Sequence, residues 1–138
     1  MRRSVALCTL AAACVCLVGC ARARRPDGPF REAQEFADAF SDQVVGCTRE
    51  HTPPGTGQVV VAAEFTAAGE PPLIHDIGSL AGSDPVLECL RKHAAEKLHC
   101  PAKAPAKYVR IRAPVPLVTS EVSYAFLPEL PRPNPDQP

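Results

Sequence analysis

The side chains best suited to chemistry in this chain are seven cysteines and four histidines. Thiolates and imidazoles can bind zinc together, and a thiolate beside an imidazole can act as a nucleophile. Cys47, Cys89 and Cys100 form no Cys-x2–4-Cys pair, and no two histidines have helical ligand spacing. No glycine-rich phosphate loop or Gly-x-Ser-x-Gly elbow occurs either. We expect no enzyme activity, cofactor or metal site. The alternative is a metal- or redox-linked envelope factor that uses Cys100 with the nearby His93 and His99.

The first nineteen residues have the organisation of a secretory signal peptide. Arg2 and Arg3 provide a positive charge, and an apolar stretch follows over residues 4–18. That stretch is shorter than the roughly 20 apolar residues that a membrane span needs. The pattern predicts an export signal that is cleaved before residue 20.

Residues 17–20, Leu-Val-Gly-Cys, resemble the lipobox of bacterial prolipoproteins. In that class the cysteine thiol accepts a diacylglyceryl group, and the small residue before it admits the peptidase. The resemblance implies that Cys20 carries lipid, including palmitate-type chains, and anchors the protein to a membrane. Ala21 replaces the aspartate that marks inner-membrane retention in some bacteria, which favours the outer membrane, facing the periplasm. The alternatives are ordinary cleavage near residues 21–23 and an uncleaved anchor.

The charge balance argues against a nucleic-acid partner. The chain has 15 basic and 15 acidic residues, and two of the arginines lie in the signal segment. Nucleic-acid binding needs a concentrated positive surface, and the longest basic run is the short stretch at residues 22–25. We expect the partners to be the membrane, through the lipid, and an unidentified envelope protein.

Periodic patterns predict five elements behind a tether at residues 20–29. Apolar residues recur at helical spacing over 31–49, and alternation marks strands over 58–66, 72–77 and 108–115. A second helix opens at Ser83-Asp84-Pro85, whose residue types suit a helix start, and ends at Pro101. The order α-β-β-α-β predicts an α+β domain over 30–118. Two helices would cover one face of a three-stranded antiparallel sheet of strand order second-first-third.

The last part of the chain, residues 119–138, is rich in proline, which predicts a disordered tail. An alternative remains, in which this segment adds a further strand. The apolar residues that would form that strand are Val122, Tyr124, Phe126 and Leu127.

Several of these features resemble a TonB C-terminal-like domain of the type found in gliding-motility proteins. They are the strand at 58–65, the turn at Gly69, the helix that opens at 83–90, Pro101 and a last strand that ends near Pro114. The resemblance implies a non-catalytic domain that binds a protein or an envelope component, often by adding a strand to a sheet edge. Two features depart from the family: a cysteine occupies the position of the aromatic residue before Pro101, and the Tyr-Pro element of true TonB is absent.

The family's two cysteines, one before the first strand and one in the last helix, match Cys47 and Cys89. Spacing agrees, since a continuous helix would hold Cys89 and Cys100 roughly 16 Å apart, too far for a disulfide. Two packed helices can bring Cys47 and Cys89 together, so we predict this bridge. The loop entropy that it removes from the unfolded chain would stabilise the fold by about 4 kcal/mol. A Cys47–Cys100 bridge and three reduced cysteines remain alternatives.

The predicted binding edge is the third strand, which we expect at the sheet margin. Its outward residues would be Tyr108, Arg110 and Arg112, on the face opposite Val109 and Ile111. An extended segment of a partner could pair with the free backbone groups of this strand.

Overall fold

The computed structural model describes residues 28–132. The predicted signal peptide, the lipobox with Cys20 and most of the tether lie outside the described residues, as do residues 133–138. Among the residues described, no helix is long and apolar enough to cross a bilayer.

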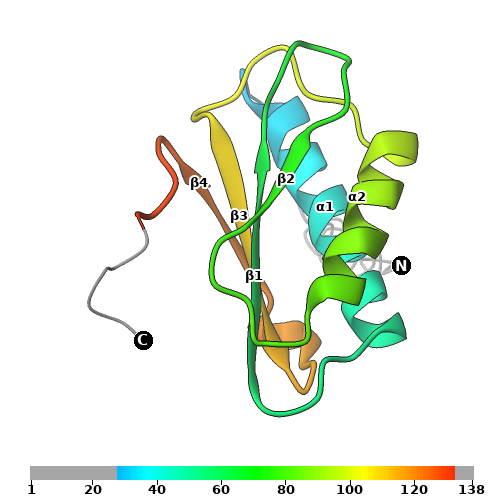
Figure 1. Ribbon diagram of the computed structural model, residues 1–138. Helices are drawn as coiled ribbons and strands as arrows, with labels where there is room; N and C mark the ends of the chain where they lie inside the picture. Colours follow the sequence, from blue (N-terminus) through cyan, green and yellow to red (C-terminus); the bar gives the residue numbers. More distant parts are fainter. Residues whose placement is uncertain (1–27, 133–138) are drawn as a thin grey trace, which may run out of the picture.

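Two helices cover one face of a four-stranded antiparallel sheet (Figure 1). The helices are α1 (Arg31–Glu50) and α2 (Asp84–Lys97), which lie side by side and run in opposite directions. The strands in chain order are β1 (Gly57–Glu64), β2 (Leu73–Asp76), β3 (Tyr108–Val115) and β4 (Ser123–Leu127). A short 3-10 helix, η2 (Thr119–Glu121), precedes β4. The predicted α+β class is confirmed, but the sheet has one strand more than expected.

Both helices form because each places apolar side chains on one stripe that is buried against the sheet. In α1 the buried apolar residues are Ala33, Phe36, Ala37, Phe40, Val44 and Cys47. In α2 they are Val86, Leu87, Leu90 and Ala94. Pro85 sits in the first turn of α2, where a missing N–H breaks no hydrogen bond. The packed helices therefore hold their facing side chains in fixed positions.

Helix α2 ends at Lys97, earlier than the expected stop at Pro101. The backbone after it pairs with the β1–β2 connection instead. The N–H of Cys100 donates to the carbonyl of Glu70 at 2.8 Å, and the N–H of Gly69 donates to the carbonyl of Cys100 at 2.9 Å. The first bond uses the N–H that a longer helix would direct to the carbonyl of Glu96.

The strands lie in the order β2-β1-β3-β4. The predicted placement of the first strand between the other two is correct, and β1 pairs antiparallel with both neighbours. The expected margin position of the third strand is wrong, because β4 pairs along β3 from Tyr108↔Leu127 to Arg112↔Ser123. β3 is therefore an interior strand, and the edges of the sheet are β2 and β4.

The fold also extends past residue 118, the expected boundary of the disordered tail. Residues 119–127 form η2 and β4, so the alternative of an added strand describes this segment. Its half-buried Val122 and Phe126 pack against the core, and the ring of Phe126 lies 6.5 Å from that of Phe65. The apolar side chains of this segment precede Pro128, where the closely spaced prolines begin. Their burial against the core orders this strand.

Candidate functional site

A disulfide joins Cys47 of α1 to Cys89 of α2, with their Cα atoms 5.8 Å apart. This confirms the predicted pairing. Cys100 is unpaired and buried, so neither the rival Cys47–Cys100 bridge nor the fully reduced alternative describes the structure. The bridge links two helices that are far apart in the sequence at the point where they cross.

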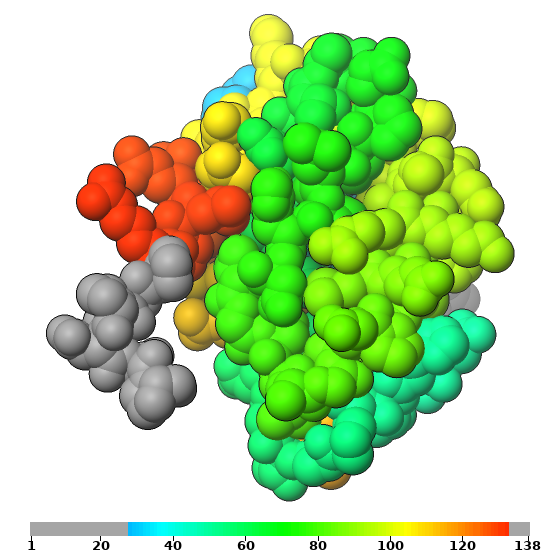
Figure 2. Space-filling view, viewed as in Figure 1, coloured from blue at the N-terminus to red at the C-terminus, as the bar shows by residue number. Residues whose placement is uncertain are grey.

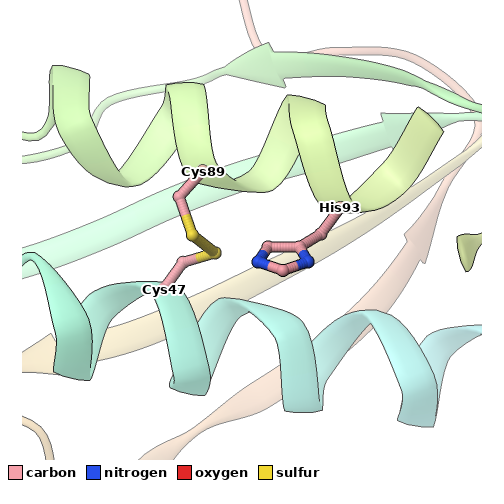
Figure 3. Close-up of side chains that lie close together, drawn as sticks. All are labelled: Cys47, Cys89 and His93. Carbon is pink, nitrogen blue, oxygen red and sulfur yellow. A yellow bond between two sulfur atoms is a disulfide. The ribbon is translucent and has the colours of Figure 1, made fainter. Parts of the chain in front are cut away.

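Two histidines lie near this disulfide, and their spacing from the cysteines is not among the metal-site patterns considered for the sequence. His93 follows Cys89 by one helical turn and turns its ring toward the sulfurs (Figure 3). Ligand atoms of Cys47, Cys89 and His93 all lie within 4.8 Å of one another. Glu50 and His51 form a second such group with Cys89. The missed signal is Cys-x3-His, which occurs at both cysteines and places thiol and imidazole on one helix face.

Cys100, the centre of the alternative redox or metal hypothesis, lies in a different environment. Its side chain is 4% exposed, and its sulfur accepts a hydrogen bond from the N–H of Thr66 at 3.4 Å. The neighbouring His99 ring is exposed and lies 3.1 Å from the carbonyl of Gly69. Among the described residues, Cys100 belongs to no group of potential metal ligands. Its contacts are those of a residue that ties the β1–β2 connection to the end of α2.

The predicted edge residues Tyr108, Arg110 and Arg112 point their side chains to the sheet face away from the helices. Alternation along β3 sets this direction, since Val109 and Ile111 are fully buried on the helix side. The backbone groups of all three pair with β4. The structure therefore brings these residues together on an open sheet face, but not at an edge.

Arg110 has an unusual environment on that face. Its Nε is buried and finds no hydrogen-bond acceptor within the described part of the chain. Burial lowers the pKa of the Arg110 guanidinium, and the charge of Arg112 lowers it further. Both effects make the charge at Arg110 less favourable in the folded protein than in water.

A small polar cluster occupies the same face beside Tyr108. Nε2 of His75 lies 2.8 Å from one carboxylate oxygen of Glu64, and Nζ of Lys107 lies 3.4 Å from the other. The hydrogen bond with His75 lowers the pKa of Glu64, burial opposes that shift, and Lys107 lowers the pKa further. Lys107 also lies over the ring of Tyr108. Both carboxylate oxygens of Glu64 have a partner, which is typical of cross-strand stabilisation.

The outer edge of β4 has free backbone groups. The N–H of Phe65 donates to the carbonyl of Lys107. In this register, the backbone N–H and C=O groups of odd-numbered residues in β3 point toward β1, and those of even-numbered residues point toward β4. In the observed register, the backbone groups of Tyr124 and Phe126 must then point away from β3. Within residues 28–132 no backbone hydrogen bond reaches them. Figure 2 shows this end of the chain, in red, at the margin of the molecule away from α2.

The opposite edge, β2, is protected. It has only four residues, two prolines precede it, and the carboxylate of Asp76 accepts hydrogen bonds from the N–H groups of Gly78 and Ser79. A hollow of about 310 Å³ lies between this edge and α2, lined by Leu73 and Arg91 among others. Short length, proline and charge are the devices by which proteins discourage pairing at an edge.

A comparison of the chain with protein-family models, curated proteins and solved structures finds no match. A function has to be argued from the residues and their geometry.

Proposed function

We propose that this protein is a lipid-anchored component of the cell envelope whose domain binds an extended segment of a partner protein along the outer edge of β4. The observation that carries the binding proposal is the character of this edge. β4 has the sequence Ser-Tyr-Ala-Phe-Leu, without charge or proline. The two residues whose backbone groups point away from β3, Tyr124 and Phe126, are both aromatic. Free backbone groups supply affinity in strand addition, and neighbouring side chains supply specificity.

The contrast between the two edges supports this choice. β2 carries the protective features described above, whereas β4 presents Tyr124, which is 40% exposed, beside the half-buried Phe126. A partner strand would continue the sheet and cover both rings. It would gain main-chain hydrogen bonds at Tyr124 and Phe126 without any rearrangement of the domain.

A TonB C-terminal-like assignment of the domain remains part of the proposal. It rests on the order of helices and strands, on the turn at Gly69 and on the positions of Cys47 and Cys89. Gly69 has a φ of +82°, which favours glycine. Strand addition, the binding mode implied by the TonB C-terminal-like resemblance, agrees with a free sheet edge. The free edge of this domain is β4 and not the third strand.

The lipid anchor at Cys20 is supported by the signal architecture and the lipobox. Helix α1 begins at Arg31, so the predicted tether is short. Ten extended residues reach about 35 Å at most, which would hold the domain close to the membrane surface. A partner would then be another component of the envelope, reached from the outer membrane on its periplasmic side. No enzyme activity, cofactor or nucleic acid enters this proposal.

The test of the edge places a photo-crosslinking amino acid at Ser123 of the full chain in intact cells. The captured protein is identified by mass spectrometry, and capture is repeated with Tyr124→Pro. Proline removes the outward N–H of Tyr124 and leaves the pairing of Ser123 and Ala125 with β3 in place. We expect the captured band to disappear.

Tyr124→Ala is the matched control, because it removes the same ring and keeps the N–H. Binding through main-chain groups predicts that this variant still captures the partner, more weakly. Both variants should show the far-ultraviolet circular dichroism of the unmodified chain. Equal capture by Tyr124→Pro and the unmodified chain would refute strand addition at β4.

The anchor is tested separately with Cys20→Ser. This variant removes the thiol that would carry the lipid, so we expect metabolic labelling with palmitate to be lost. Labelling that persists in Cys20→Ser would rule out this residue as the lipidation site, without bearing on the β4 edge.

A further inference from the structure

The two packed helices carry the same short pattern, and both copies meet at the disulfide. Cys47 and His51 are separated by one turn of α1 and its cap, and Cys89 and His93 by one turn of α2. Because residues four apart lie on one helix face, each cysteine has an imidazole beside it. Cysteine and histidine are the usual ligands of zinc in proteins.

His93 is the histidine best placed to join both sulfurs. Ligand atoms of Cys47, Cys89 and His93 are mutually within 4.8 Å, and Figure 3 shows the ring beside the disulfide between α1 and α2. His51 belongs to a separate group, with Glu50 and Cys89. It also lies beside the Glu50 carboxylate, at 3.7 Å. One histidine therefore shares a potential site with both thiols, and the other does not.

We propose that the reduced form of this protein binds one Zn²⁺ through Cys47, Cys89 and His93, with water in the fourth position. The site exists only after the disulfide is opened, because thiolates and not disulfide sulfurs bind zinc. This role is independent of strand addition at β4 and of the anchor at Cys20.

The opening step requires a dithiol reductant. One thiolate of the reductant attacks Sγ of Cys89, which is half-buried, whereas Cys47 is only 2% exposed. Cys47 leaves as a thiolate and takes up a proton. The second thiol of the reductant then displaces Cys89 and closes the reductant's own disulfide. Two electrons and two protons pass to the protein in total, and Zn²⁺ later replaces the two thiol protons.

The helix positions suit the bound state as well as the oxidised one. Tetrahedral Zn–S bonds of about 2.3 Å place two sulfurs about 3.8 Å apart. The Cα atoms of Cys47 and Cys89 are 5.8 Å apart, so side-chain rotation alone can open the sulfurs to that spacing. The metal would then take over the role of the disulfide and keep α1 attached to α2. The protein would thus have a covalent clamp under oxidising conditions and a zinc clamp under reducing ones.

The test uses the full chain purified in detergent, oxidised or reduced with dithiothreitol that is then removed without air. We expect one Zn²⁺ per chain in the reduced sample and none in the oxidised one. Co²⁺ in place of Zn²⁺ should give thiolate-to-metal charge-transfer absorption and the bands of tetrahedral cobalt. Zinc should also slow the return of the disulfide in air.

His93→Ala and His51→Ala form the decisive pair, because both leave every thiol of the chain in place. Loss of a ligand should weaken zinc binding by at least about tenfold in His93→Ala, whereas His51→Ala should bind as the unmodified chain does. Circular dichroism of the oxidised variants confirms that they fold. Equal binding by His93→Ala, weakened binding by His51→Ala in its place, or a reduced chain that stays unfolded with zinc would each overturn the proposal.

Discussion

The ring Nε2 of His75 on β2 lies 2.8 Å from a carboxylate oxygen of Glu64 on β1. The pair is diagonal across the β1–β2 ladder, because the register places Glu64 opposite Leu73 and His75 opposite Ala62. Lys107 contacts the other oxygen of the same carboxylate. These contacts lower the pKa of Glu64 in the folded state, despite the opposing effect of burial.

The depressed pKa of Glu64 predicts how its contribution to stability depends on pH. A carboxylate whose folded-state pKa is lowered stabilises the fold above its unfolded pKa of about 4.3, and loses that effect as the pH falls through the folded value. Glu64→Gln should therefore lower the free energy of unfolding at pH 7, by about 0.5 kcal/mol after screening by solvent. The difference should shrink as the pH falls below about 4.3 and vanish only once the pH lies below the lowered pKa of folded Glu64. Urea denaturation at a series of pH values measures it, and a difference that stays constant down to pH 3 would contradict this assignment.

Removal of the disulfide should have the largest effect on stability. The bridge joins residues separated by 42 positions, and loop entropy gives about 4 kcal/mol for a span of that length. We expect Cys47→Ala with Cys89→Ala to lower the free energy of unfolding, measured by urea denaturation, by a corresponding amount. Cys100→Ala serves as a control with both bridging sulfurs intact. A loss below about 1 kcal/mol would mean that α1 and α2 keep residual contacts in the unfolded chain, so that the bridge restricts it little.

Cys100 should be inert in the native protein. Its 4% exposure and the hydrogen bond from Thr66 leave its sulfur out of reach of a water-soluble reagent. We expect iodoacetamide to label Cys100 in the folded, oxidised chain only as fast as the domain unfolds, and quickly in urea. Rapid labelling without denaturant would revive a reactive role for this thiol beside His99.

Docking of β4 on the core should depend on Phe126 more than on Tyr124. Phe126 is half-buried against Phe65, whereas the Tyr124 ring is 40% exposed. Phe126→Ala should lower the free energy of unfolding by about 2 kcal/mol, less than truncation of a fully buried phenylalanine, and Tyr124→Ala by well under 1 kcal/mol. Equal losses from the two variants, measured by urea denaturation, would show that the ring of Phe126 does not anchor the strand.

Periodicity predicted the elements that bury one continuous face. β3 has the predicted bounds because Val109, Ile111 and Ala113 alternate with polar residues, and a buried stripe of the same kind defines α1. The expected packing of α1 against α2 made the Cys47–Cys89 bridge predictable. β4 was expected only as an alternative to a disordered tail, since five residues before a proline-rich segment give a weak alternation signal. Because the disordered tail was the main expectation, β3 became the expected edge.

The proposed zinc ligands have a signal in the sequence, but it differs from the histidine pairs and Cys-x2–4-Cys pairs that usually mark a zinc site. Cys89-x3-His93 has helical spacing, and so has Cys47-x3-His51. What spacing alone could not tell is which histidine faces both sulfurs. That depends on how α1 and α2 cross, a tertiary property that separates His93 from His51.

Arg110 offers a last test of the open sheet face. Its Nε is buried without an acceptor in the described part of the chain, and Arg112 lies on the same face, so the folded state carries both a desolvation penalty and a charge repulsion. Arg110→Met keeps the apolar stem that packs on the sheet and removes both penalties. We expect the free energy of unfolding to rise by about 1 kcal/mol. Arg112→Met is the matched comparison: Arg112 is exposed, so this change removes the repulsion alone and should give the smaller rise. If Arg110→Met instead destabilises the domain, the guanidinium makes a contact that compensates for its burial. Arg110 would then be stabilising the fold through its charge.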